Sequence, residues 1–311
     1  MRIARKSRPR AGAESSAPAR AAPELAAAGV RPAKSRGQNF LVQPAIAGRI
    51  VAAAALAPGD HVLEIGPGLG MLSEQIAAHR IASLTMIEID PRLAERLAGR
   101  FAGDRRARVV AGDFLKSDLA GVFARGPVKV MGNLPFNSAA AILRRLCGWS
   151  RVIELAVLMF QREVGERIRA HPGSSEYSAL SVFTQLYFEI VSHFRVGAGN
   201  FHPRPKVDAE VLVMRPYPAA RFSAAEEAGV LRTVRAAFSA PRKTLRNSLG
   251  QALGISPARI EAALGRATID PGLRAGALGA DDLLKLARAL GADLTIADAC
   301  ADACADACAD A

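Results

Sequence analysis

Cysteine is scarce in this sequence, and long apolar runs are missing from it. The 311 residues include four cysteines, of which Cys147 stands alone in the body of the chain and three lie in the tail. This distribution offers no disulfide framework, so we expect a reduced, intracellular, cytoplasmic protein. No stretch reaches the roughly 18 apolar residues of a membrane span. The longest, Ile50–Pro58, is mostly alanine, so we expect no membrane partner.

Acidic residues are also in short supply. Asp and Glu number 29 against 41 Lys and Arg, which gives a formal net charge of +12 and a sequence pI near 10.3. This excess of positive charge points to a polyanionic partner, most simply nucleic acid, although composition leaves open a basic protein that binds none. Half of the residues are apolar and 23% are charged, which is a globular composition. The length suggests about two domains.

The chain divides into four segments by composition. Residues 1–36 are rich in Ala, Arg, Pro and Ser and predict a disordered basic arm, although an organelle transit peptide has a similar bias. Residues 37–218 alternate strand and helix patterns, whereas residues 219–292 show helix patterns only. Residues 293–311 contain an Ala-Asp-Ala-Cys repeat. We expect a frayed tail there, with a soft-metal site on its three thiols as the alternative.

The alternation within residues 37–218 predicts an α/β fold. Short apolar runs separated by helical segments form a parallel sheet with helices on both faces. Two later runs, Ile190–Val196 and Val207–Arg215, predict a hairpin that closes the sheet at its edge. The expected parallel strands are His61–Ile65, Leu84–Ile89, Arg108–Ala111, Val128–Met131 and Val152–Phe160, and the expected helices are Met71–His79, Pro91–Phe101, Ser138–Cys147, Glu226–Phe238, Arg242–Leu253, Pro257–Leu264 and Asp281–Leu290.

A glycine-rich loop follows the first expected strand. Gly66, Gly68 and Gly70 stand before the next helix, where glycines let the backbone approach a ligand closely. A dinucleotide fingerprint requires glycine at position 71, but this chain has Met71, and Glu64 precedes the loop. A carboxylate there is unfavourable beside a pyrophosphate and suits a cofactor with a positive end, such as S-adenosylmethionine.

Two further carboxylates stand at the ends of the next two strands. Glu88 can accept both hydroxyls of a ribose, and Asp113 can accept an exocyclic adenine amine. Together with Glu64 they put an acidic side chain at three successive strand ends. This pattern favours a cofactor pocket over an ordinary tight turn.

A short motif, Asn133-Leu134-Pro135-Phe136, follows the fourth strand at the ligand-binding edge of such sheets. The exocyclic amine of adenine is a poor nucleophile because its lone pair is delocalised into the ring. Acceptors on its two N–H groups, here the Asn133 side-chain oxygen and the Pro135 carbonyl, would draw the nitrogen toward tetrahedral geometry. Phe136 can stack on the base. The motif predicts methyl transfer to adenine, and an Asn-Pro turn with a core Phe is the alternative.

Several motifs in combination resemble the rRNA adenine N6,N6-dimethyltransferases of the KsgA type, which modify two adjacent adenosines near the end of small-subunit rRNA. Besides the glycine-rich loop they are Gly37–Leu41, Asn133–Phe136, Phe201–Asp208 and Phe238–Leu249, in the family's order. The resemblance implies a Rossmann-like class I methyltransferase sheet with a small C-terminal helical domain that binds RNA. It also implies S-adenosylmethionine as cofactor and a role in small-subunit biogenesis, acting on rRNA within a pre-ribosomal small subunit.

The resemblance further implies roles for individual residues. Asn39 and Leu41 would line the methionine end of the cofactor. Phe201 would cover the second face of the target base, unless it anchors the Pro-rich loop in the core. The remaining cofactor contacts would come from Gly66, Gly68, Glu88, Asp113 and Asn133.

One residue departs from the KsgA pattern. Phe136 stands where those enzymes usually have Tyr, and Phe occurs there in the related macrolide-resistance methyltransferases, which act on large-subunit rRNA. That activity is one alternative function. A non-catalytic ribosome-assembly or transcription factor that keeps the fold is another. The block that contains Arg242 and the helical segment after it favour the KsgA type.

A basic cluster stands at the start of an expected helix. Arg242, Lys243 and Arg246 occupy positions i, i+1 and i+4, so much of their charge would share one side. Such a cluster can hold rRNA phosphates without reading sequence. Spacing alone fits a solvated face as well, but the net charge and the resemblance favour RNA. The histidines show no metal-ligand spacing, so we expect no metal, and we expect a monomer.

Overall fold

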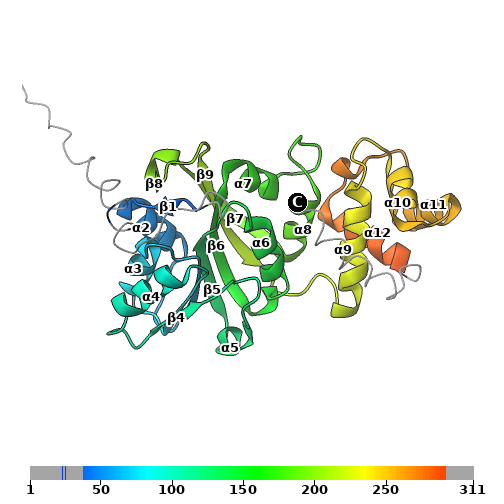
Figure 1. Cartoon of the computed structure of the whole chain (residues 1–311). Coiled ribbons are helices and arrows are strands. Elements are labelled where there is room, and N and C mark those ends of the chain that lie inside the picture. Colours follow the sequence, from blue (N-terminus) through cyan, green and yellow to red (C-terminus); the bar gives the residue numbers. More distant parts are fainter. Residues whose placement is uncertain (1–22, 24, 26–37, 292–311) are drawn as a thin grey trace, which may run out of the picture.

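A seven-stranded mixed sheet forms the centre of the computed structural model, which describes residues 23, 25 and 38–291 (Figure 1). The strand order is β4-β3-β2-β5-β6-β9-β7. The first five strands in this order run parallel, and β9 runs antiparallel to both of its neighbours. The strands are β4 (Ala107–Ala111), β3 (Ser83–Glu88), β2 (His61–Ile65), β5 (Val128–Asn133), β6 (Ile153–Gln161), β9 (Ala209–Pro216) and β7 (Phe188–Val196).

Helices cover both faces of this sheet. Helices α2, α3 and α4 lie on one side and α6 and α8 on the other, while α9 to α12 gather at one end of the molecule (Figure 1). β3 is buried along its whole length, as expected for a strand between two others with helices on both faces. The helices are α2 (Pro44–Ala53), α3 (Met71–Ala77), α4 (Pro91–Arg100), α5 (Ala120–Phe123), α6 (Ala139–Cys147), α7 (Arg162–Arg169), α8 (Ala179–Tyr187), α9 (Ala224–Phe238), α10 (Leu245–Leu253), α11 (Pro257–Arg266) and α12 (Ala280–Leu290).

The predicted strand pattern is confirmed. All five parallel strands lie within a few residues of their expected bounds, and β7 and β9 form the antiparallel pair with β7 outermost. A further two-stranded ribbon, β1 (Phe40–Leu41) with β8 (Phe201–His202), was not predicted. It pairs Leu41 with Phe201 and so joins the first motif of the chain to the Pro-rich loop.

Four of the described helices, α2, α5, α7 and α8, were not predicted. α7 is strongly charged and carries Gly165 in its interior, which weakens a helix pattern. α8 passes directly into β7 at Phe188 with no Gly or Pro between them. The apolar residues of the two elements therefore merge into one run that periodicity cannot divide.

Helix α10 begins later than predicted. Arg242 and Lys243 lie in a turn before it, where the Lys243 N–H donates to the Ala240 carbonyl at 2.9 Å. Thr244 is the N-cap residue, with extended backbone. The prediction of a helix from Arg242 is wrong because the extended backbone of Thr244 interrupts it, and the Leu245 N–H that begins the helix donates to the Leu273 carbonyl at 2.8 Å.

Two large apolar cores lie on the two faces of the sheet. One contains residues of α2, α3 and the face of the sheet that they cover. The other contains residues of α6 and α8 and continues without a break into α9 to α12, through residues such as Phe188, Val230 and Leu283. It also holds Cys147, which is buried and has a free thiol. The division of the chain near residue 218 into two domains stays a prediction.

The two ends of the chain are largely outside the described residues. These exclude the Cys-containing tail and most of the basic arm. Leu25 is among the described residues, and it is only 3% exposed. This burial differs from the solvent exposure expected for a residue of the basic arm. None of the helices in residues 38–291 is long and apolar enough to cross a bilayer.

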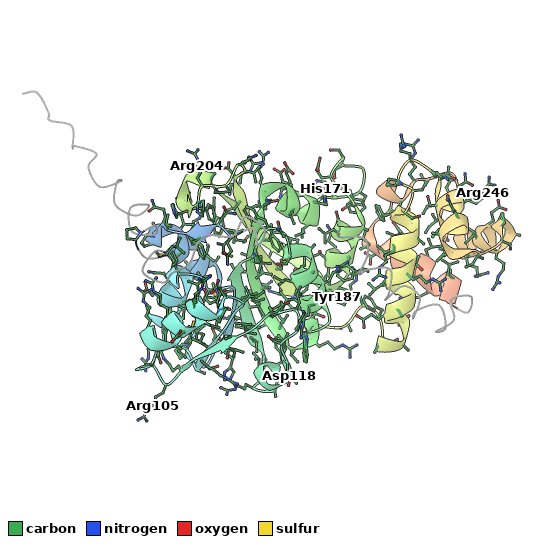
Figure 2. All side chains as sticks on the ribbon, viewed as in Figure 1. Arg105, Asp118, His171, Tyr187, Arg204 and Arg246 are labelled. Atoms are coloured by element: carbon green, nitrogen blue, oxygen red, sulfur yellow. The ribbon has the colours of Figure 1, made fainter. Side chains whose placement is uncertain are left out.

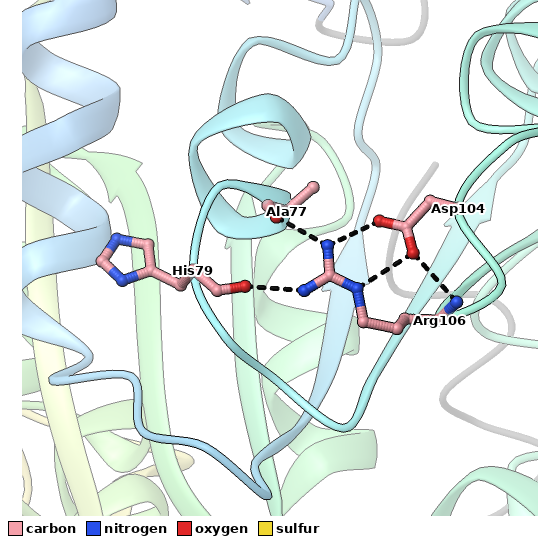
Figure 3. Close-up of polar contacts among 4 residues, drawn as sticks. All are labelled: Ala77, His79, Asp104 and Arg106. Carbon is pink, nitrogen blue, oxygen red and sulfur yellow. Dashed lines mark hydrogen bonds and ion pairs between the residues drawn. The ribbon is translucent and has the colours of Figure 1, made fainter.

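Arg106 closes the end of α3 (Figure 3). Its guanidinium donates to the Ala77 carbonyl at 2.8 Å and the His79 carbonyl at 2.7 Å, which supplies partners at the C-terminal end of this helix. Asp104 holds the guanidinium in place, with nitrogen–oxygen distances of 2.9 and 2.7 Å. The arginine also lowers the pKa of the Asp104 carboxyl through this hydrogen bonding. Because α3 follows the glycine-rich loop, this cap supports the element that begins at that loop.

We predict that Arg106→Ala lowers the melting temperature by roughly 2–4 °C, which corresponds to a loss of about 1 kcal/mol after discounting for solvent screening. Arg105→Ala is the matched control, because Arg105 is an exposed neighbour of the same charge. Thermal melts of the two variants test the cap. Equal melting temperatures for the two variants would show that water satisfies the carbonyls at the end of α3 as well as the Arg106 guanidinium does.

Candidate active site

A pocket opens at the carboxyl ends of β2, β3 and β5. Four segments line it: residues 38–41, the loop and first turn after β2, the end of β3, and residues 133–138 after β5. Parallel strands bring their carboxyl ends to one edge of a sheet, which is where ligands bind in such folds. The pocket gathers eight of the predicted residues, namely Asn39, Leu41, Gly66, Gly68, Glu88, Asn133, Pro135 and Phe136.

The glycine-rich loop has a conformation that only glycine adopts easily. Gly66 and Gly68 have φ angles of 65° and 57°. A Cβ atom on Gly68 would lie 2.8 Å from Cδ1 of Phe40, so the loop packs directly against that ring. At Gly66 and Gly68 the pocket is therefore lined by backbone.

Glu88 connects the loop to the end of β3. Its Oε2 accepts from the Gly68 N–H and its Oε1 from the Asp90 N–H, both at 2.9 Å. The residue is 3% exposed, and this burial raises its pKa, an effect that the two backbone donors oppose. Each carboxylate oxygen can accept more than one hydrogen bond, so Glu88 retains capacity for a ligand hydroxyl.

Glu64 presents a buried acceptor without a partner. It is 1% exposed, and its Oε2 has no hydrogen-bond partner among the described residues. Burial raises its pKa to about 8; the nearby charge of Glu88 adds to the effect, and Ser73 opposes it. A cationic ligand in the pocket would offset the desolvation of this carboxylate. The site therefore fits a cofactor with a positive end, and Glu64 would face that end.

The orientation of the Asn133 amide is fixed by one bond. Its Nδ2 donates to the Asn39 carbonyl at 2.9 Å. Because a carbonyl oxygen can only accept, the amide nitrogen must face it and Oδ1 must face the other way. Oδ1 is therefore available to accept from a ligand N–H at the rim of the pocket.

The rest of the Asn-Leu-Pro-Phe motif shapes the neighbouring wall. The Pro135 carbonyl already accepts from the Ser138 N–H at 3.1 Å, so one of its two acceptor positions is used in a turn. The Leu134 carbonyl takes no part in that turn bond. Phe136 is half-buried and lines the pocket, so its ring is accessible to a flat ligand.

The family model described as ribosomal RNA adenine dimethylase matches residues 31–290. The chain belongs to this family. It is therefore an rRNA adenine dimethyltransferase, and S-adenosylmethionine is its methyl donor. Since the matched range includes every pocket-lining segment, the pocket described above is the candidate active site of this dimethylase.

This chain aligns with nearly the whole length of relatives from the same family. Ribosomal RNA small subunit methyltransferase A of Geobacter sulfurreducens is 40% identical over 266 residues, covering 84% of this chain and 96% of the relative. The protein of that name from Moorella thermoacetica is 42% identical over 272 residues, covering 84% and 93%.

Solved structures confirm the Rossmann-like class I methyltransferase fold. A dimethyladenosine transferase from Plasmodium falciparum superposes with a TM-score of 0.68 at 24% identity, covering 81% of this chain and 98% of that one. The 23S rRNA methyltransferase ErmE superposes with a TM-score of 0.62 at 29% identity, covering 81% and 100%.

Of the residues predicted to contact the cofactor or the target base, Phe201 and Asp113 do not line the pocket. Phe201 is 3% exposed and belongs to the apolar core beneath β1, so its placement argues for a core anchor and against stacking on the target base. Asp113 lies just beyond β4, where its Oδ1 accepts from the Leu115 N–H at 2.9 Å. Its role toward adenine stays a prediction.

The basic cluster lies at the other end of the molecule. Figure 2 shows Arg246 on the outer helices, far from Arg204 beside β8. Arg246 pairs with Glu261 at 2.8 Å, and Lys243 donates to Gln251 at 2.7 Å, so both are engaged within the protein. Any contact of these residues with RNA is therefore remote from the pocket.

Sequence patterns missed several apolar residues of the pocket. Ile89 is 49% exposed, and it lines the pocket directly after Glu88. An apolar residue that immediately follows an acidic strand end was the available signal. Glu64 was noted but was not assigned to the site. The other missed residues are Gln38, Phe40, Pro67, Leu69, Met71, Leu72, Leu134, Asn137 and Ser138.

No group of His, Cys, Asp and Glu suited to a metal occurs among the described residues.

We predict a pH-dependent stability from Glu64. The folded protein holds a proton on this carboxyl up to about pH 8, whereas the unfolded chain releases it near 4.5. The contribution of Glu64 to the free energy of unfolding is therefore complete below the pKa of the unfolded chain. It declines as pH rises above that value, by up to about 1.4 kcal/mol per pH unit. Glu64→Gln should accordingly gain stability relative to wild type between about pH 5 and about pH 8.

Urea unfolding across this pH range tests the prediction, with Glu95→Gln as the control at an exposed position. A difference between wild type and Glu64→Gln that does not vary with pH would mean that Glu64 is ionised throughout.

Proposed function

We propose that this dimethylase methylates the N6 amines of two adjacent adenosines near the 3' end of small-subunit rRNA. The observation that carries the chemistry is the Asn133 amide, which lines the pocket and is oriented by its bond to the Asn39 carbonyl so that its oxygen faces away from that carbonyl. The choice of subunit rests on relatives named as small-subunit methyltransferases, which are about 40% identical. The 23S rRNA methyltransferase ErmE is less similar, at 29%, so the large-subunit alternative is not favoured.

The cofactor would lie against the loop after β2. When bound, S-adenosylmethionine supplies a methyl group on a positively charged sulfur. Glu64 would face its cationic part, and Glu88 would accept from its ribose. Ile89 would offer an apolar surface to its adenine ring, since it lines the pocket and is 49% exposed.

The target amine would be held by acceptors of the Asn-Leu-Pro-Phe motif. Asn133 Oδ1 would accept from one N–H of the amine. The predicted second acceptor is the Pro135 carbonyl, but its turn bond to Ser138 makes the Leu134 carbonyl the better candidate. Phe136 would stack on the base and fix its plane. The methylated amine would lose its proton to water, so no strong base is needed.

Further parts of the proposal concern where the protein acts. The protein would act as a monomer. The net charge of +12 supports binding to rRNA within a pre-ribosomal small subunit, which assembles in the cytoplasm. Residues 219–292 would form the RNA-binding domain. Within the cluster, Arg242 is exposed and has no ion pair among the described residues.

We predict that Asn133→Ala slows the chemical step by roughly 100-fold or more, because the lost acceptor acts mainly as the amine becomes tetrahedral. Asn200→Ala is the matched control: its amide donates to the Gly197 carbonyl at 2.8 Å, outside the pocket. Single-turnover methylation with radiolabelled S-adenosylmethionine measures the step on unmodified small and large subunits. Label in the large subunit, or a normal rate for Asn133→Ala, would contradict the proposal.

A second prediction concerns the RNA-binding role of the outer helices. Arg242→Ala should weaken small-subunit binding and reduce the slope of log affinity against log salt by about 0.7–0.9, as for one lost phosphate contact. Arg125→Ala removes the same charge at an exposed position after α5 and should leave the slope unchanged. Titrations of small subunits at several salt concentrations measure the slope for both variants. An equal slope for Arg242→Ala and Arg125→Ala would mean that the RNA binds elsewhere on the protein.

A further inference from the structure

Leu25 belongs to a small apolar cluster beside the cofactor pocket. It is 3% exposed and packs with Phe40, Val42, Leu69 and Leu93. This cluster is separate from the two large cores of the sheet. Leu25 precedes residue 31, where the match to the family model begins. The cluster therefore joins a residue from outside the family's shared region to residues within it.

Two members of the cluster form the wall of the pocket. Phe40, on β1, and Leu69, in the glycine-rich loop, both line it. The ring of Phe40 lies so close to Gly68 that a Cβ atom there would be 2.8 Å from Cδ1. The position of that ring therefore limits where the loop backbone can lie on this side.

The other side of the loop is held by α4. Arg100 donates to the Leu69 carbonyl at 3.1 Å, and a Cβ atom on Gly70 would lie 2.8 Å from Leu97 Cδ2. Leu93 of the same helix is fully buried in the Leu25 cluster. The loop thus lies between β1 and α4, and the cluster that contains Leu25 includes residues of both.

Backbone hydrogen bonds hold the loop at Gly66 and Gly70, but its glycines have no side chains that pack. Glycine also has more backbone freedom than any other residue. The loop is linked to Glu88 through the Gly68 N–H, so a displaced loop changes the surroundings of that carboxylate. A side chain that fills the space behind Phe40 and Leu69 can therefore affect Glu88 without touching a ligand.

We propose that Leu25 is a positioning residue for the cofactor pocket: its side chain packs the wall formed by Phe40 and Leu69 and thereby holds the glycine-rich loop in the geometry that binds S-adenosylmethionine. The proposal rests on the proposed function, because it takes that pocket as the cofactor site. It adds a contribution from the N-terminal segment, which composition alone had described as a solvated arm.

The test compares Leu25→Ala with the conservative variant Leu25→Met, which keeps the volume of the side chain. Leu273→Ala is the matched control, because that leucine is 38% exposed in the helical region. Calorimetry gives the Kd for S-adenosylmethionine in the full-length proteins. Steady-state methylation of small subunits gives kcat and the KM for each substrate, and melts confirm that every variant is folded at the assay temperature.

We expect Leu25→Ala to raise the Kd and KM for S-adenosylmethionine by about 5-fold or more, with kcat at saturating cofactor and the KM for the subunit close to wild type. Leu25→Met should restore most of the affinity. Phe40→Leu should raise the Kd as well, and the double variant should lose less than the product of the two single effects, because both act through one contact.

A purely structural role gives a different result and would overturn the proposal: kcat would fall with the active fraction of Leu25→Ala, while its Kd for S-adenosylmethionine stayed at the wild-type value. The wild-type protein separates this result from a failure of the proposed function. If wild type binds no S-adenosylmethionine in calorimetry, both proposals are wrong. If it binds and Leu25→Ala binds equally well, only the role of Leu25 is wrong.

Discussion

The hydrogen bond from the Gly68 N–H to Glu88 Oε2 is the contact on which the pocket depends. It ties the glycine-rich loop to the end of a buried strand. Glycine is needed at this position because the ring of Phe40 occupies the place of a Cβ atom. One backbone N–H therefore sets both the path of the loop and the direction of the Glu88 carboxylate.

The same arrangement gives the pocket its electrostatic character. Two carboxyl groups, Glu64 and Glu88, lie buried side by side at the ends of neighbouring strands, and burial raises the pKa of each. Backbone donors compensate Glu88 at both oxygens, whereas Glu64 keeps one oxygen without a partner. This asymmetry suits a ligand with a hydroxyl-bearing part and a cationic part, and it disfavours phosphate.

The pocket and the residues proposed to bind RNA lie in separate parts of the molecule. The proposed acceptors for the target amine lie at the sheet edge, where strand ends are held by their neighbours. The basic residues of the outer helices lie at the far end (Figure 2), and two of the three predicted ones are engaged with Glu261 and Gln251. A large substrate could contact both regions at once, which suits a folded rRNA better than a short oligonucleotide.

Local sequence was sufficient for much of the fold and of the site. The α/β alternation follows from hydrophobic periodicity, which is a property of neighbouring residues. The glycine-rich loop and the Asn133–Phe136 motif are also contiguous, so their chemistry could be deduced from the residue types and the strands that they follow. The strand ends then placed Glu88 and Asn133 at one edge, because parallel strands share that edge.

Tertiary structure alone decided what depends on distant segments. The pairing of β1 with β8 buries Phe201 in the core and leaves Phe40 against the loop. The start of α10 and the partner of Arg246 depend on packing among outer helices. Leu25 is buried only because three separate elements leave an apolar site for it. No local period or motif encodes such contacts, since they exist only once remote parts of the chain have been brought together.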